Sequence, residues 1–273
     1  MSYENPPVPD HVNVSREDPV VEFLRLLAAL AVIAGLVSAV LFFAGGWLAR
    51  YIPFQMELAL AGDDAGDNTL SPFPAESADA AIEKYLQELA DELAAKMDVP
   101  ADMPIHVRYV ETDVPNAFAT LGGRVFVTSG LYTRMPSENA LSMVLAHEVA
   151  HIRERDPISA LGGVAMMQLV LALMGGEAAS LTPYIAHLVQ LGYSRRVEWR
   201  ADSLAMEAVR QRYGHLGGAA ATFEVLADYK DAAGARVPSL LSTHPADSER
   251  IARLREAARE GDGAIQPLRL KTN

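Results

Sequence analysis

Two histidines that flank a glutamate are the clearest sign of chemistry in this sequence. Residues 147–151, His-Glu-Val-Ala-His, form an H-E-x-x-H pattern. Positions i and i+4 share one face of a helix, so the imidazoles of His147 and His151 can reach a single metal ion. Glu148 is displaced by one residue, which can place its carboxylate beside a reacting water instead of on the metal. Neutral imidazole suits zinc, and a zinc ion with three protein ligands keeps one position open. The alternative is a chance match on an amphipathic helix.

A pair of carboxylates further along the chain offers the third ligand. Glu198 and Asp202 are four residues apart on a predicted helix. One carboxylate could therefore bind zinc while the other accepts a hydrogen bond from a ligating histidine and fixes its orientation. The alternative is a solvated acidic face that pairs with the neighbouring arginines Arg195, Arg196 and Arg200.

Together with two further motifs, these residues resemble a known family. The motifs are Asn116-Ala117-Phe118 and Ser242-Thr243-His244-Pro245, the second followed by Arg250. Over residues 75 to 260 the chain resembles the HtpX-like and prenyl-protease-type zinc metallopeptidases, which are membrane-associated gluzincins with soluble relatives of the BepA type. The resemblance implies one zinc ion per chain and hydrolysis of peptide bonds in protein substrates.

The resemblance also implies a role for each matched residue. The expected zinc ligands are His147, His151 and Glu198, with Glu148 as general base and acid. Asp202 is expected to support a ligand, Asn116 to lie on an edge strand that receives substrate, and His244 and Arg250 to approach the reacting carbonyl.

The last three residues also have a physical interpretation. An extended peptide can add to an exposed sheet edge, and a histidine or arginine near the metal can stabilise the oxyanion of the transition state. The simpler alternatives are a turn residue for Asn116, a capping residue for His244 and a surface ion pair for Arg250.

The elements that must position these residues follow from hydrophobic periodicity. A helix capped by Ser77, a strand at 105–110 and a β-hairpin around a Leu-Gly-Gly turn precede the H-E-x-x-H helix, which starts at Pro136 and Ser137. Nearly everything after Ser137 is predicted to be helical. We therefore expect an α+β fold: a mainly helical zincin-like metallopeptidase domain with a small β-sheet, preceded by one transmembrane helix.

That N-terminal helix is predicted from an uninterrupted apolar run. Residues 26–44 contain Ser38 as their only polar residue, and their length matches the hydrocarbon core of a bilayer. The competing interpretation is a secretory signal peptide, which the late start of the run and the lack of a small-x-small cleavage site disfavour. The predicted organisation is a polar tail at 1–22, an anchor at 23–49, a linker at 50–75 and the metallopeptidase domain at 76–273.

Composition excludes several classes of function. The chain has 273 residues, no cysteine and a formal net charge of −12. It therefore has no disulfide framework and no thiol nucleophile, and its charge argues against a nucleic-acid-binding surface. The predicted partners are protein or peptide substrates and the lipid bilayer, while the oligomeric state is not predictable from the sequence.

A second apolar stretch, residues 158–176, could span a bilayer by its length. His151 and Glu198 must meet on one metal, so the chain between them crosses a membrane an even number of times. Residues 178–192 would make a poor second span, which favours no crossing. Arg16 and Arg25 near the start of the anchor favour a cytoplasmic N-terminus and a catalytic domain on the far side.

These features predict a membrane-anchored zinc endopeptidase. By the resemblance, it would reside in a bacterial inner membrane, face the periplasm and act on misfolded or envelope proteins. The alternative is a non-catalytic membrane chaperone or assembly factor that keeps the zinc fold, although such a protein has no physical need for Glu148.

Overall fold

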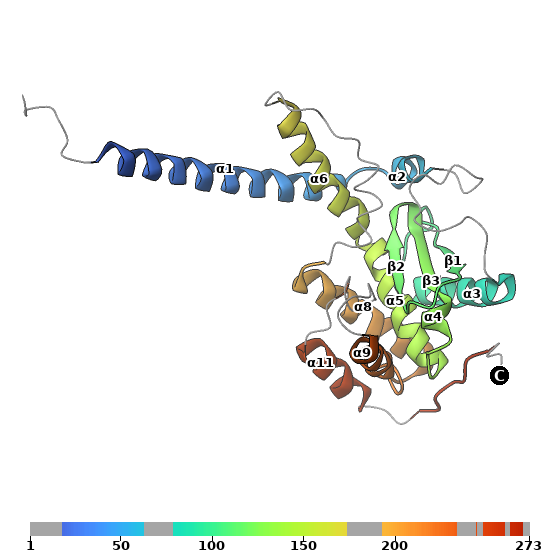
Figure 1. The fold of residues 1–273 in the computed structure, drawn as a ribbon. Helices are drawn as coiled ribbons and strands as arrows, with labels where there is room; N and C mark the ends of the chain where they lie inside the picture. The colour runs from blue at the N-terminus through green and yellow to red at the C-terminus, as the bar shows by residue number, and fades with distance from the viewer. Residues whose placement is uncertain are drawn as a thin grey trace, which may run out of the picture.

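A long N-terminal helix projects from a helical body that contains one small sheet (Figure 1). The computed structural model describes residues 18–62, 79–173, 193–233, 244, 248–259 and 263–269. Helix α1 (Pro19–Ala49) begins four residues before the predicted anchor, with the side chain of Asp18 accepting a hydrogen bond from the Val20 N–H. The predicted α+β class with a long apolar N-terminal helix is confirmed.

The sheet has three strands in the order β1-β3-β2. Strand β1 (His106–Val110) is parallel to β3 (Arg124–Thr128), and β2 (Ala117–Thr120) is antiparallel to β3. The predicted hairpin is confirmed, and its turn is the short helix η1 (Leu121–Gly123). Gly123 has a φ of 73°, and a Cβ there would collide with the carbonyl oxygen of Pro104, so the turn requires glycine. The hairpin leaves β2 at one edge of the sheet.

Helix α5 (Glu138–Arg153) carries the H-E-x-x-H pattern through the centre of the body. It begins where the sequence predicts, because the Ser137 side chain accepts a hydrogen bond from the Ala140 N–H. All of its residues except Arg153 are buried. A central position of this kind holds the imidazoles in fixed rotamers, since neighbouring side chains fill the space around them.

The other helices of the body enclose α5. Helix α3 (Ala80–Lys96) packs on α5 and β1, and its N-cap is Asp79. The predicted cap, Ser77, lies outside the described residues. Helix α8 (Arg195–Tyr213) packs along α5, as the carboxylate pair requires. The remaining helices are α4 (Ser129–Tyr132), α9 (Ala221–Ala233) and α11 (Ser248–Ala258).

The junction between α1 and the body is folded over residues 50–62, the first part of the predicted linker at 50–75, while residues 63–75 lie outside the described part of the chain. Residues Phe54–Ala61 form helix α2, and both Phe54 and Glu57 are buried. The Glu57 carboxylate accepts a hydrogen bond from the Gly122 N–H at 3.0 Å, which fixes α2 to the turn of the hairpin. The apolar pattern of α2 is short, and burial against a distant turn is a tertiary contact that its sequence does not show.

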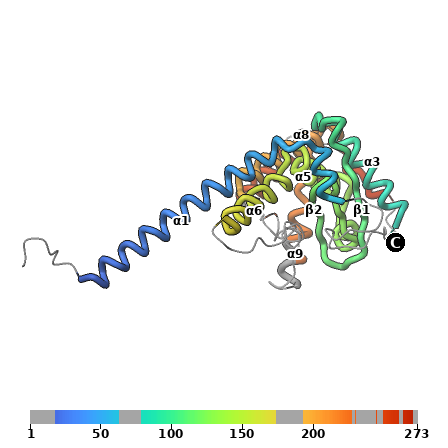
Figure 2. The backbone as a smooth tube through the Cα atoms, turned by 90° about the horizontal axis from the view of Figure 1, so that it is seen from above, coloured from blue at the N-terminus to red at the C-terminus, as the bar shows by residue number. Residues whose placement is uncertain are grey.

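Helix α6 (Asp156–Leu173) packs against the C-terminal part of α1 and runs beside it in the view of Figure 2. Gly45, Gly46 and Ala49 of α1 are buried in this contact, while the rest of the apolar surface of α1 is exposed. In the described part of the chain, α1 and α6 are the two helices that are long and apolar enough to cross a membrane.

Candidate metal centre

Four buried side chains converge at the centre of the body. His147 and His151 come from α5 and Glu198 from α8. His244 lies in the chain between α9 and α11. One ligand atom from each lies within 4.8 Å of the others, so all four can surround one ion. The three predicted ligands are thus brought together, and His244 lies among them.

The two imidazoles on α5 approach each other closely. Their Nε2 atoms are 3.1 Å apart, and the Glu198 carboxylate oxygens lie 3.4 Å from that of His147 and 3.6 Å from that of His151. The His244 Nδ1 is 3.2 Å from the His147 Nε2 and 3.1 Å from Glu198.

Each imidazole on α5 has its own carboxylate on the outer side. The Nδ1 of His147 is 3.0 Å from Asp202, and the Nδ1 of His151 is 2.9 Å from Asp156. The contact of Asp202 is the one expected for a supporting carboxylate. Asp156 was missed from the sequence, although its place five residues after His151 and at the start of a new helix is a signal that could have identified it.

These contacts indicate that the site fits a cation. When each Nδ1 donates a proton to its carboxylate, each Nε2 can present a lone pair toward the centre. Two ring nitrogens 3.1 Å apart beside a carboxylate need a proton or a metal ion between them, because the negative groups otherwise repel one another. Two imidazoles and one carboxylate are also the ligand types that zinc prefers.

The charges around the centre shift the pKa values of its groups. Burial lowers the pKa of His147, but the bonds to Asp202 and Glu198 outweigh burial and raise it to about 10. Burial opposes ionisation of Asp202, yet the bonds from Arg250 and His147 lower its pKa to about 2. Burial lowers the pKa values of His151 and His244. A metal ion that binds here must therefore displace the proton of His147, whereas His151 and His244 are already neutral.

Glu148 is held beside the centre by the edge strand. One carboxylate oxygen accepts a hydrogen bond from the Ala119 N–H at 2.8 Å, and the other lies 3.5 Å from the His244 Nε2. Burial raises the pKa of this carboxyl group, which the nearby His244 and His147 partly offset. A fixed carboxylate with a raised pKa next to a metal site is suited to accept and return a proton.

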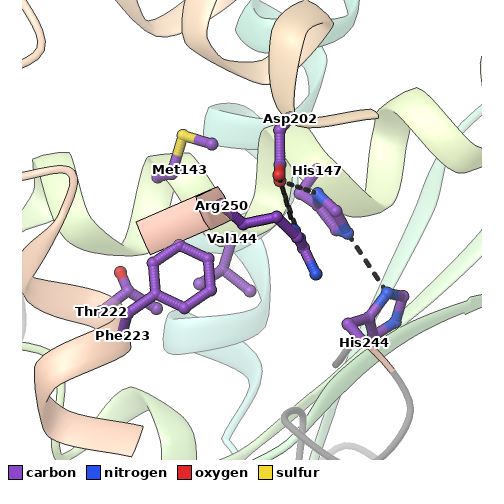
Figure 3. A pocket seen from close by; sticks show the side chains of 8 residues that line it. All are labelled: Met143, Val144, His147, Asp202, Thr222, Phe223, His244 and Arg250. Carbon is purple, nitrogen blue, oxygen red and sulfur yellow. Dashed lines mark hydrogen bonds and ion pairs between the residues drawn. The ribbon is translucent and has the colours of Figure 1, made fainter. Parts of the chain in front are cut away.

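Arg250 binds carboxylates in this structure. Its guanidinium makes two hydrogen bonds to Asp202, at 2.7 and 2.8 Å, and lies 2.7 Å from Glu198. The side chain is only 3% exposed, which excludes the alternative of a surface ion pair. Figure 3 shows Arg250 directed at Asp202, which also contacts His147, beside a cavity of about 30 Å³. Arg250 therefore holds the two carboxylates of α8, which differs from the expected approach to the reacting carbonyl.

Asn116 lies one residue before β2, and its backbone is bonded to the neighbouring strand. Its N–H donates to the Thr128 hydroxyl at 2.8 Å, and its carbonyl accepts from the Thr128 N–H at 3.0 Å. Backbone groups alternate in direction along an antiparallel strand, so those of Ala117 and Ala119 face the open edge. The edge strand is present, but the backbone of Asn116 is bonded to Thr128. The outward backbone groups belong to Ala117, which is buried, and to Ala119, whose N–H binds Glu148.

One aromatic contact was not anticipated. The ring of Tyr193 stacks on the imidazole of His151 with a centroid distance of 4.4 Å. It comes from the residue two positions before α8, so the segment that supplies Glu198 also covers one face of a ligand.

Comparison with known proteins supports the same chemistry. The model of a family described as Peptidase family M48 matches residues 80–258. A protease HtpX homolog of Salinibacter ruber is 29% identical over 85% of this chain and 96% of its own length, and one of Burkholderia multivorans is 30% identical over 70% and 80%. The beta-barrel assembly-enhancing protease of Escherichia coli is 28% identical over 67% of this chain, which spans only 40% of that protein.

Proposed function

Because the chain belongs to peptidase family M48, a family of zinc metallopeptidases, we propose that it is a membrane-anchored zinc endopeptidase that cleaves proteins. The observation that carries the proposal is the convergence of His147, His151 and Glu198 around one point, with Glu148 fixed beside it. This arrangement supplies both a metal site and a base, which are the two parts that metal-assisted peptide hydrolysis needs.

His147, His151 and Glu198 would hold the zinc ion. When bound, zinc polarises the scissile carbonyl and makes water a stronger nucleophile. Glu148 accepts the proton of the attacking water and returns it to the leaving amine, so one carboxylate acts twice. Its bond to the Ala119 N–H keeps it oriented through both transfers.

The open edge of β2 supports an extended protein substrate. A peptide that pairs with the outward backbone groups of Ala117 and with the carbonyl of Ala119 would pass directly by Glu148, because the Ala119 N–H is bonded to that carboxylate. Backbone pairing requires no particular side chains, so it suits a peptidase that acts on unfolded chains. His244 stands next to Glu148 and would stabilise the oxyanion that develops on the carbonyl.

The competing function is a chaperone that keeps the metal fold without catalysis. A protein that only binds has no use for an oriented buried carboxylate, whose burial costs free energy. Glu148 is buried beside His244 and His147, and this position therefore favours the peptidase.

Helix α1 is proposed to remain as a membrane anchor. A cleaved signal peptide would take with it the surface that buries Gly45, Gly46 and Ala49 against α6. The exposed apolar side chains of the N-terminal two thirds of α1 then face lipid. Leu169, Leu171 and Leu173 are exposed on α6, so this helix would contact the same bilayer without crossing it.

Arg16 and Arg25 lie before or near the start of α1, and only Arg50 follows its end. This distribution supports a catalytic domain in the periplasm of a bacterial inner membrane. That side would give access to misfolded envelope proteins, a setting consistent with the name of the similar beta-barrel assembly-enhancing protease of Escherichia coli. A phosphatase reporter fused after residue 273 checks the side, since activity requires export and an inactive fusion would reverse the orientation.

The decisive experiment compares the wild-type protein with Glu148→Gln. The purified full-length chain should hold about one zinc per molecule and cleave an unfolded protein such as casein. Glu148→Gln should keep the zinc and lose most of the activity, because the ligands remain while the base is gone. Full activity of the variant would refute the mechanism, and a wild-type protein that binds no zinc would refute the proposed function.

A further inference from the structure

Arg50, the first residue after α1, contacts the Asp156 carboxylate, which is bonded to the candidate metal ligand His151. We propose that Arg50 is a positioning residue for the zinc site and that α1 thereby controls how tightly the peptidase holds its metal. The proposal rests on the proposed zinc site and adds to it a physical link to the membrane anchor.

The link runs through the two oxygens of Asp156. One oxygen is 2.9 Å from the Nδ1 of His151, and the other accepts from Arg200 at 2.7 Å and from Arg50 at 3.2 Å. Asp156 is only 2% exposed, so its charge needs these partners. The two guanidinium groups hold one oxygen in place, and this leaves the second oxygen directed at His151.

A neighbouring contact fixes the same junction. Arg155 adopts a left-handed backbone conformation with a φ of 62°, which turns the chain from α5 into α6. Its side chain donates to the carbonyl of Ile52 at 2.6 Å and pairs with Glu57 at 3.1 Å. Arg155 and Asp156, two consecutive residues after the H-E-x-x-H helix, thus both contact the segment that directly follows α1.

Helix packing prevents α1 from moving independently. A Cβ placed on Gly45 would lie 2.5 Å from the carbonyl oxygen of Gly162 and 2.6 Å from the Cβ of Met166, so the backbones of α1 and α6 are in close contact. Asp156 is the first residue of α6. A shift of α1 would therefore move both Arg50 and the start of the helix that carries Asp156.

Zinc affinity of the full-length protein in detergent micelles tests this link, with a chromophoric chelator as competitor. Asp156→Asn should weaken zinc binding by about 10- to 100-fold, the usual effect of losing an outer partner of a ligating histidine. Arg50→Gln should weaken it by about 3- to 10-fold, because Arg200 still holds Asp156. Arg255→Gln is the matched control, since it removes an exposed arginine that pairs with Glu224, and it should change nothing.

Two further variants separate positioning from general stability. Arg50→Lys keeps the charge and should restore most of the zinc affinity. In the Asp156→Asn background, Arg50→Gln should have no further effect, because its route to His151 is already lost. Unchanged zinc affinity in Arg50→Gln, or an equal loss in both backgrounds, would overturn the proposal while wild-type zinc binding leaves the proposed function intact.

Discussion

At the scale of single residues, two carboxylates of α8 share one buried guanidinium. Glu198 is oriented toward the metal site and Asp202 supports His147, and Arg250 contacts both. Burial opposes ionisation of Glu198, but its bonds with His147 and His244 lower its pKa. Arg250 offsets part of the negative charge and so allows two carboxylates to lie four residues apart in the interior.

Arg250→Ala should lower the free energy of unfolding by about 3–5 kcal/mol, because it removes the buried guanidinium that neutralises both Asp202 and Glu198. Urea denaturation measures this loss. Arg255→Ala on the same helix is the control, and its exposed ion pair with Glu224 should contribute less than about 1 kcal/mol. If Arg250 instead acted on the reacting carbonyl, its removal would reduce kcat and leave the unfolding free energy unchanged.

His244→Ala should reduce kcat by about 10²- to 10³-fold, the range seen when an oxyanion donor is removed. His147, His151 and Glu198 remain, so the zinc content should stay near one per chain. Metal analysis alongside casein cleavage distinguishes the two roles. Loss of zinc from this variant would show that His244 is a ligand, which its position 3.1 Å from Glu198 also permits.

At the scale of elements, the start of α5 is fixed by a buried glutamate. The Glu138 carboxylate accepts hydrogen bonds from Tyr85 at 2.6 Å, Arg212 at 2.8 Å and Tyr213 at 2.9 Å. These residues come from α3 and α8, so Glu138 joins three helices at the N-terminus of the one that carries the H-E-x-x-H pattern. A carboxylate in the first turn also interacts favourably with the helix dipole.

Glu138→Gln should lower the free energy of unfolding by about 1–3 kcal/mol at pH 7. Burial raises the pKa of Glu138, but its bonds from Tyr85, Arg212 and Tyr213 outweigh burial and lower it below 4.5. The stability that ionised Glu138 contributes is therefore present above pH 4.5 and is lost as the pH falls through its folded pKa.

Denaturant unfolding of wild type and variant across this pH range, with a chelator present throughout, measures the difference. The two proteins should converge in acid, because glutamine does not titrate. A difference that grows as the pH falls would contradict the assignment of charge to Glu138.

At the scale of the whole molecule, the crossing of α1 and α6 joins the long N-terminal helix, the proposed membrane anchor, to the rest of the structure. Small residues permit it: Gly45 faces Gly162, and Gly46 faces Ser159. Phe42 covers Gly163 at the outer end of the contact. Close packing of small residues is a common way for apolar helices to associate, because lipid offers no hydrophobic driving force between them.

The double variant Phe42→Cys/Gly163→Cys should form a disulfide in oxidised membranes, because the nearest atoms of the Phe42 ring lie 2.8–2.9 Å from the position of a Cβ on Gly163. The chain has no other cysteine, so mass spectrometry of the linked peptides is unambiguous. Gly35→Cys/Gly163→Cys is the control, since nothing lies within 4 Å of a Cβ at Gly35. Absence of the first link would contradict the packing, and loss of the peptide containing residue 42 would indicate signal cleavage.

Much of the candidate site can be predicted from the local spacing of residues in the sequence. The positions of His147 and His151, and of Glu198 and Asp202, follow from the helical repeat, which places residues four apart on one face. The apolar run of α1 and the glycine turn of the hairpin are equally local, since chain length and backbone conformation determine them. The two pairs of candidate site residues, the hairpin and the long N-terminal helix could therefore be predicted without a structure.

Contacts between distant segments were decided only by the tertiary structure. The direction of Arg250, the partnership of Asp156 with His151 and Arg50, and the burial of α2 all depend on how helices pack. An arginine on an amphipathic helix has the same local pattern whether it meets solvent or a buried carboxylate. Packing chooses between them, because a buried charge is stable only where the fold provides its partner.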